Sequence, residues 1–184
     1  MGAIYGSSYY QIVDGPTWER SASNAVQNGG HLVTINTRSE DEFVEDFLES
    51  YFSGLNKIRD GSQVYFSRNN EEQSSDVWIG LNDKDNEGQY LWHSGETVSY
   101  IETNELYDDN GIQDYVALRY VTATKWGWDD QENADTNNAQ YGRSNIRYSN
   151  KVGIAEIPLS YFSISDASSS NGDITTLTFS KGGV

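Results

Sequence analysis

The spacing of apolar positions predicts two amphipathic helices among short strands in the first fifty residues. Thr17 is a plausible N-cap, and Trp18, Ala22 and Ala25 after it fall on one helical face. A capping box at Ser39–Glu42 precedes a second apolar stripe. The elements expected here are a strand at 9–13, a helix from Trp18 to the Gly29-Gly30 pair, a strand at 31–35 and a helix to about Tyr51.

Strands dominate the rest of the pattern, which indicates an α+β domain of two helices and antiparallel strands. Residues 53–76 are polar and weakly patterned, and we expect an insertion loop there. The other expected elements are a strand, turn and strand at 78–92, an irregular stretch at 99–113, a strand at 115–120, an acidic-aromatic corner at 126–130, a polar loop at 131–150 and a strand at 152–159.

A change of composition near Ser160 marks a soft domain boundary. The tail from Ile164 to Val184 is rich in Ser, Asp, Gly and Thr, with one possible strand at 175–179. We therefore expect one domain at 1–160 and, at 161–184, an extension, a linker or the start of a following repeat.

Charge and composition exclude several function classes. The net charge of −16, from 28 acids and 12 bases, argues against nucleic acid and anionic membrane surfaces as partners. The chain has no Cys and only two His, which excludes disulfides and zinc sites of the Cys or His-rich type. No run approaches the roughly 20 apolar residues of a membrane span, so we expect no membrane insertion. The 13 Tyr and 5 Trp exceed what a core needs, and some are expected on a binding surface.

The turn between two aromatic strands carries more acid than a hairpin requires. Asp83, Asp85 and Glu87 lie between the strand of Trp78 and that of Trp92. A hairpin needs Asn, Asp or Gly, but it does not need a Glu as well. Either these acids are solvated or salt-bridged, or they hold a cation.

The order of the motifs resembles the C-type lectin-like domain over about residues 8–159. The motifs that carry the resemblance are Trp18…Ala22, Gly29-Gly30-His31-Leu32-Val33, Trp78-Ile79-Gly80-Leu81, Gly88-Gln89-Tyr90…Trp92, Asp114-Tyr115-Val116-Ala117-Leu118, Gly127-Trp128-Asp129-Asp130 and Gly153-Ile154-Ala155-Glu156. The resemblance implies two helices flanking small antiparallel sheets, with a long irregular loop region. Tyr115 and Ala155 stand where half-cystines are expected, so aromatic packing must replace the disulfides, as in similar bacterial domains.

The resemblance also implies a Ca²⁺ site that joins the acidic turn to the long loop. By position, Asp83 and Glu87 match the ligands in the turn, and Asp108 and Asp114 match those in the loop. Gln113 stands where the family has a Glu shared between two sites. Carboxylates with an amide oxygen form a credible Ca²⁺ shell.

A second, sugar-binding Ca²⁺ site matches the family less well. Asp129 and Asp130 match a Trp-Asn-Asp triplet with Asp in place of Asn, and Glu105 matches the start of a Glu-Pro-Asn triplet. Leu106 replaces the proline, and Tyr107 offers a phenol in place of an amide. The alternatives are that Asp129 and Asp130 cap a turn, or that the loops bind a ligand in another way. The aromatic side chains that could form such a surface are Tyr100, Tyr107, Trp126 and Tyr141.

These observations favour an extracellular or cell-surface recognition module that is stabilised by Ca²⁺. It would bind a glycan or a protein through its loops. The alternative is a structural or adhesive spacer with a decayed sugar site. Crowded acids in a polar loop do not suggest the apolar pocket of a hydrolase, so we expect no enzyme. The stretch 162–168 resembles the beginning of a Calx-beta-type adhesion repeat, which implies a larger multidomain chain, whereas a disordered extension is the alternative.

Overall fold

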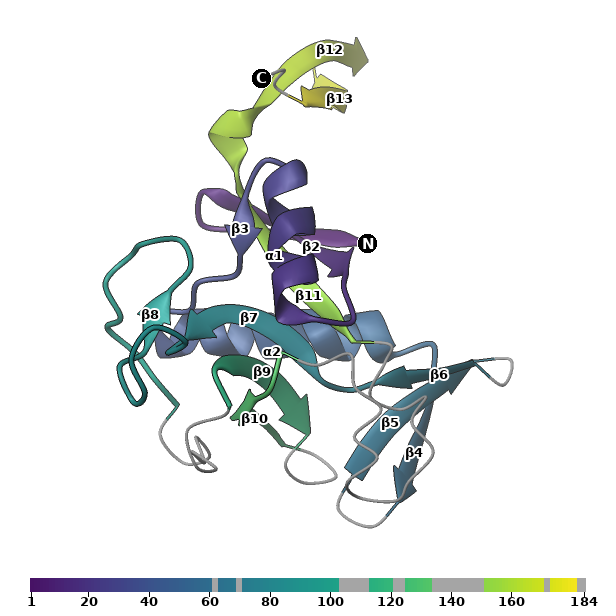
Figure 1. The fold of residues 1–184 in the computed structure, drawn as a ribbon. Coiled ribbons are helices and arrows are strands. Elements are labelled where there is room, and N and C mark those ends of the chain that lie inside the picture. Colours follow the sequence, from purple (N-terminus) through teal and green to yellow (C-terminus); the bar gives the residue numbers. More distant parts are fainter. Residues whose placement is uncertain are drawn as a thin grey trace.

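A mixed sheet of eight strands, with one helix on each face, forms the body of the molecule (Figure 1). The computed structural model describes residues 1–60, 63–68, 71–102, 113–120, 125–133, 151–170 and 173–181. The strands follow one another in the order β1-β2-β11-β7-β9-β10, while β3 pairs with β11 and β8 pairs with β7. The strands of this sheet are β1 (Gly2–Tyr5), β2 (Ser8–Asp14), β3 (His31–Leu32), β7 (Val77–Asn82), β8 (Leu91–Trp92), β9 (Tyr115–Tyr120), β10 (Trp126–Gln131) and β11 (Val152–Pro158).

Helix α1 (Trp18–Gln27) begins and ends where the sequence predicts. The Thr17 side chain accepts a hydrogen bond from the backbone N–H of Arg20 at 3.1 Å. Gly29 has φ +90°, and Gly30 lies so close to β11 that a Cβ there would overlap the carbonyl oxygen of Glu156. This Gly-Gly pair therefore both ends the helix and lets the chain enter the sheet.

Helix α2 (Arg38–Phe52) begins one residue before the predicted capping box, because Thr37 rather than Ser39 is the N-cap. Three acids of this helix accept hydrogen bonds from aromatic side chains outside the helix, and we call these contacts the α2 clasps. The clasps are Tyr10 Oη to Glu40 at 2.9 Å, Trp128 Nε1 and Tyr100 Oη to Asp41 at 3.0 and 2.9 Å, and Trp126 Nε1 to Glu49 at 3.0 Å with Tyr120 Oη on the same oxygen.

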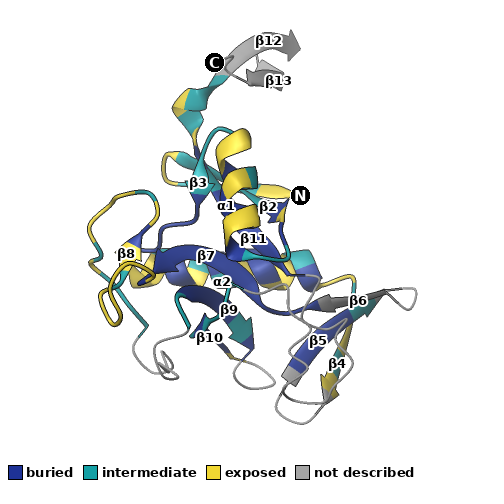
Figure 2. Cartoon of the chain, viewed as in Figure 1, coloured by how far each residue is buried: buried dark blue, intermediate teal, exposed yellow. Residues whose placement is uncertain are grey.

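The two faces of the sheet are covered by different helices, which accounts for the unbroken burial of β7 in Figure 2. Trp78 packs in one apolar cluster with Trp18, Ala22 and Ala25 of α1. Alternate positions of β7 join a second cluster with the apolar face of α2. This alternation is expected for a strand buried on both sides. Trp78, Trp92 and Trp128 are all buried, which confirms their predicted place in the core.

The expectation of a loop at 53–76 is wrong. The described residues of this segment form a three-stranded sheet of β4 (Asn56–Asp60), β5 (Gln63–Arg68) and β6 (Glu71–Ser74). Phe66 of β5 stacks on Phe52 of α2 with ring centroids 4.1 Å apart, which fixes the insertion to the core. Residues 126–130, expected as a corner, are instead part of the regular strand β10.

The described part of the tail is a separate two-stranded hairpin. After the 3₁₀ turn η2 (Leu159–Tyr161), strands β12 (Phe162–Ser170) and β13 (Asp173–Lys181) pair with each other and not with the eight-stranded sheet. The expected strand at 175–179 is thus part of a longer one. In Figure 1 the hairpin projects from the body next to the end of β11.

Candidate functional site

Asp83 folds its side chain back into the acidic turn instead of pointing to solvent. It is 2% exposed. Its Oδ2 accepts the backbone N–H of Gly88 at 2.8 Å, and its own N–H donates to the carbonyl of Asp114 at 3.1 Å. Its Oδ1 is buried and has no hydrogen-bond partner. A backbone hydrogen bond thus joins the turn to the segment before β9, whereas the link predicted from the sequence runs through a cation, and one carboxylate oxygen of Asp83 is left without a partner.

Asp130 on β10 is the second buried acid at this end of the sheet. It is 1% exposed; Tyr90 Oη donates to its Oδ2 at 2.9 Å, and its Oδ1 has no partner. Burial, with smaller contributions from the charges of Asp83 and Glu87, raises the pKa of Asp130 to about 7, although the Tyr90 hydrogen bond opposes the rise.

The strand register explains why residues so distant in the sequence meet. Asn82 lies opposite Tyr115 of β9, and Tyr115 lies opposite Gln131 of β10. The residues that flank this row, Asp83 and Asp130, are therefore brought to the same end of three neighbouring strands. We call this pair the buried acid pair.

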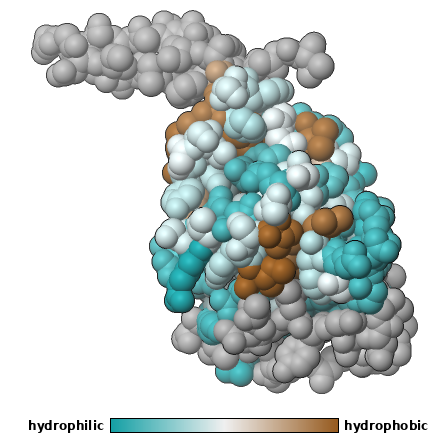
Figure 3. Space-filling view, turned by 90° about the vertical axis from the view of Figure 1, so that its left-hand side faces the viewer, coloured by the Kyte–Doolittle hydropathy of each residue, from teal (hydrophilic) through white to brown (hydrophobic). Residues whose placement is uncertain are grey.

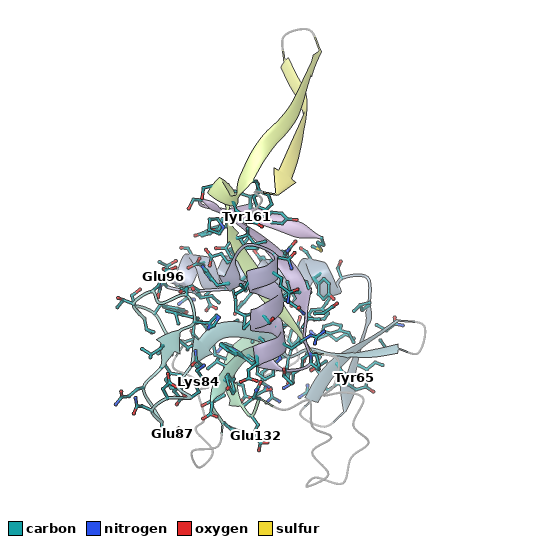
Figure 4. All side chains as sticks on the ribbon, turned by 45° about the horizontal axis from the view of Figure 1, so that its top comes forward. Tyr65, Lys84, Glu87, Glu96, Glu132 and Tyr161 are labelled. Atoms are coloured by element: carbon teal, nitrogen blue, oxygen red, sulfur yellow. The ribbon has the colours of Figure 1, made fainter. Side chains whose placement is uncertain are left out.

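Each residue of the buried acid pair has one unpartnered carboxylate oxygen, which is the type of ligand that a hard cation accepts. A buried carboxylate oxygen without a partner is unfavourable, and two like charges close together raise the cost further. A Ca²⁺ ion accepts such oxygens as ligands and offsets both charges. Of the other predicted ligands, Glu87 is exposed, Gln113 and Asp114 are partly exposed, and Asp108 lies outside the described residues. Figure 4 shows Glu87 at the outer side of the turn. Within the described residues, no three His, Cys, Asp or Glu side chains are grouped closely enough to hold a metal ion.

Asp129 has a different environment from its neighbour Asp130. Arg119 Nη1 lies 2.7 Å from Asp129 Oδ2, and Gln131 Nε2 donates to the same oxygen at 2.9 Å. A guanidinium therefore already balances the carboxylate that the resemblance assigned to a second Ca²⁺. Glu105 and Tyr107, the other residues predicted there, lie outside the described residues.

The structure contradicts the prediction that Trp126 lies on a ligand-binding surface. Its side chain is 3% exposed and packs on Tyr120, with ring centroids 4.1 Å apart, and its Nε1 donates to Glu49. Tyr100 is partly exposed, but its hydroxyl is held by Asp41. Tyr141 lies outside the described residues. Tyr90 and Arg119 were not predicted as site residues. Tyr90 stands in a motif of the sequence, but nothing in the sequence pairs either residue with its acid.

A comparison with protein families matches the lectin C-type domain to residues 15–156. The chain belongs to this family. Its members bind carbohydrate and are not enzymes, so the prediction that the chain has no catalytic function is confirmed. The C-type lectin fold and the α+β class are confirmed as well.

The relatives of this C-type lectin domain include human C-type lectin domain family 4 member D, with 27% identity over 132 residues. That match covers 70% of this chain and 50% of the relative, so the chain spans about half the length of the first curated relatives. Among solved structures, the carbohydrate-recognition domain of cow CD23, determined in the presence of an oligosaccharide, has a TM-score of 0.55 at 16% identity and covers 85% of this chain and 92% of that one. A calcium-independent type II antifreeze protein has a TM-score of 0.56 at 18% identity, with 85% and 91% covered.

Related proteins are mostly extracellular or on the cell surface. Within the described part of this domain, none of the helices combines the length and apolar character that crossing a membrane requires.

Proposed function

We propose that this C-type lectin domain is an extracellular recognition module in which one Ca²⁺ ion fixes the acidic turn to β10. Asp83 and Asp130 would hold the ion, and Glu87, Asp108, Gln113 and Asp114 are the candidates for the remaining ligands. Ca²⁺ takes six to eight oxygen ligands, so the buried acid pair supplies only some of the ligands that the ion requires.

The observation that carries this proposal is the pair of unpartnered oxygens, Asp83 Oδ1 and Asp130 Oδ1. Buried polar atoms are nearly always hydrogen-bonded in native proteins. Two unpartnered carboxylate oxygens at the same end of three paired strands therefore support a cation as their shared partner. Because bound metal and loop order each other, the ion would also stabilise the segment that leads into β9.

We do not extend the proposal to a sugar held through a second Ca²⁺ at Asp129. The Arg119 ion pair neutralises that carboxylate, and Asp130 on the same strand contributes to the other site. Carbohydrate recognition, which is the property of the family, would then rely on side-chain hydrogen bonds rather than on a metal-bridged pair of hydroxyls. The same ion pair favours the alternative of a structural or adhesive module whose ligand is a protein.

The surface next to the turn is suited to a polar ligand. Figure 3 shows that this side of the molecule is mainly hydrophilic, with apolar side chains confined to small areas. Large contiguous apolar patches mark many protein interfaces. A glycan, or a polar protein surface, is therefore the ligand class that we propose. Membership of a larger multidomain chain stays a prediction.

A calcium titration by calorimetry on metal-stripped protein tests the Ca²⁺ site. We expect a dissociation constant of about 0.1–1 mM, as in other extracellular calcium modules. Asp83→Asn and Asp130→Asn should abolish the heat, whereas the matched control Asp129→Asn should retain it. Absence of both heat and a thermal shift in the wild type would refute the site. Equal losses in all three variants would show that the acids act together and not as the pair that we describe.

A glycan array run with and without EDTA tests recognition separately. Specific binding that survives EDTA but is weakened by Arg119→Ala would support carbohydrate binding without a metal-bridged sugar. Binding that EDTA abolishes and Asp129→Asn weakens would restore the second Ca²⁺ site. A silent array, with Ca²⁺ binding intact, would favour the protein ligand.

A further inference from the structure

One short segment, residues 88–90, donates hydrogen bonds to both members of the buried acid pair. The backbone N–H of Gly88 donates to Asp83 at 2.8 Å, and the Tyr90 hydroxyl donates to Asp130 at 2.9 Å. In each acid the other carboxylate oxygen is buried and has no partner. The segment therefore holds both carboxylates by one oxygen and leaves the second oxygen of each for a ligand.

Tyr90 lies where the acidic turn returns to the sheet, so its backbone is fixed. The next residue, Leu91, begins β8 and is paired with Asn82 of β7. Asn82 Nδ2 also donates to the carbonyl of Leu91 at 3.1 Å. Asp83 follows Asn82 and Tyr90 precedes Leu91, so the antiparallel pairing brings Tyr90 beside Asp83. From that position the side chain of Tyr90 reaches Asp130 on β10.

The ring of Tyr90 is held as well as its backbone. Tyr90 is only partly exposed, and its ring packs against the apolar cluster that contains the buried face of α2. Once the ring is fixed, rotation of the O–H bond is the only freedom of the hydroxyl. Asp130 is 1% exposed, and the hydrogen bond to one of its oxygens sets the orientation of its carboxylate. The Tyr90 hydroxyl thus determines which oxygen of Asp130 stays free.

A contact of this kind is a common way in which proteins orient a metal ligand. Carboxylates that bind a metal are themselves hydrogen-bonded, and the loss of such an outer partner typically weakens metal binding about ten- to hundredfold. A phenol that donates its proton to a carboxylate is suited to this supporting role. Phenylalanine would fill the same space but could not donate a hydrogen bond. The hydroxyl of Tyr90, rather than its ring, is therefore the group to test.

We propose that Tyr90 is a positioning residue of the Ca²⁺ site. Its hydroxyl holds Asp130 so that the free oxygen of this acid faces the ion together with the free oxygen of Asp83. This inference rests on the Ca²⁺ site proposed above, and it adds a residue that acts on the site without contacting the ion. The acidic turn and its exit then contribute twice, through Asp83 as a ligand and through Tyr90, which orients the ligand on β10.

A calcium titration by calorimetry on metal-stripped protein tests this role with two Tyr→Phe variants. Tyr90→Phe should raise the dissociation constant about tenfold. Tyr10→Phe is the matched control, because Tyr10 on β2 donates to Glu40 of α2 at the same distance of 2.9 Å. It removes a phenol–carboxylate hydrogen bond of the same kind from a different acid, and it should leave the dissociation constant unchanged.

The tyrosine absorption spectrum provides a readout that a purely structural role would not change. An ion bound to Asp130 withdraws charge from the carboxylate, which weakens the hydrogen bond donated by Tyr90 and shifts the absorption of its ring. Calcium should therefore produce a tyrosine difference spectrum in the wild type and in Tyr10→Phe, whereas Tyr90→Phe should lose most of it.

Circular dichroism should show that both variants are folded, because each keeps its aromatic ring. Calcium binding by the wild type, with an unchanged dissociation constant in Tyr90→Phe, would overturn the role of Tyr90 and leave the Ca²⁺ site intact. A wild type that binds calcium without a tyrosine difference spectrum, or an equal loss of affinity in Tyr10→Phe, would overturn that role too. A wild type that binds no calcium would refute the Ca²⁺ site itself, and the role of Tyr90 with it.

Discussion

Replacing Asp130 with Asn should stabilise the metal-free protein and remove its response to calcium. Asparagine keeps an oxygen that can accept the Tyr90 hydroxyl, and its amide removes the buried charge beside Asp83. The substitution therefore separates two effects of one carboxylate. In the absence of Ca²⁺ its charge opposes folding, and in the presence of Ca²⁺ the same charge binds the ion.

The magnitude follows from the raised pKa of Asp130. The folded value is about 7, against about 3.9 for an unperturbed Asp. Because the folded pKa is raised, stability is greatest below the unfolded pKa and is lost as pH rises toward 7. A pKa difference of about three units lowers the free energy of unfolding by at most about 4 kcal/mol above pH 7. For a chain of this size, that loss corresponds to a decrease of about 8–16 °C in Tm.

Thermal unfolding at pH 8 and near pH 4, with EDTA and with excess calcium, measures this difference. At pH 8 in EDTA, Asp130→Asn should unfold at a higher temperature than the wild type, and near pH 4 the two should converge. Calcium should raise the Tm of the wild type but not that of Asp130→Asn. Asp129→Asn is the control, which loses the Arg119 ion pair and should be slightly destabilised. A lower Tm for Asp130→Asn in EDTA at pH 8 would refute the argument that this carboxylate is an unfavourable buried charge.

Substitutions at three further positions test the packing of α1 and α2 on the sheet, each by thermal unfolding. Burial and the charge of Asp41 raise the pKa of Glu45 to about 7, so Glu45→Gln should raise the Tm at pH 8 but have little effect near pH 4. Asp41→Ala leaves the buried Trp128 Nε1 without an acceptor and should lower the free energy of unfolding by about 3 kcal/mol. Asp41→Asn keeps an acceptor oxygen and should recover part of that free energy. Gly30→Ala should destabilise by about 3 kcal/mol through its overlap with Glu156, and a wild-type Tm would contradict that close approach.

Helical periodicity and the buried strand of Trp78 were sufficient to predict the body of the fold. The apolar face of each helix and its end signals are local, so α1 and α2 were recognisable within a few residues. The insertion was missed because β5 buries Val64, Tyr65 and Phe66 consecutively. A strand covered on both sides shows no alternation, and its neighbour β6 is polar throughout.

The two acids of the candidate site were named individually from the sequence, but their pairing was not predicted. Asp83 and Asp130 were both singled out, yet they were assigned to different ions, because the sequence does not reveal the register that places them together. The ion pair of Arg119 could not be predicted from the sequence. Its pairing with Asp129 depends on a diagonal contact between β9 and β10, and it changes the predicted role of that acid.

The α2 clasps have a consequence for where this domain can be made and used. They hold the helix to the sheet with carboxylates and aromatic N–H and O–H groups, and the chain has no thiol. Folding therefore needs no oxidant and no disulfide isomerase, and reducing agents have no bond to break. The domain should accumulate in native form in a reducing cytosol, and it should tolerate thiol-rich surroundings in which a disulfide-dependent scaffold would lose its cross-links.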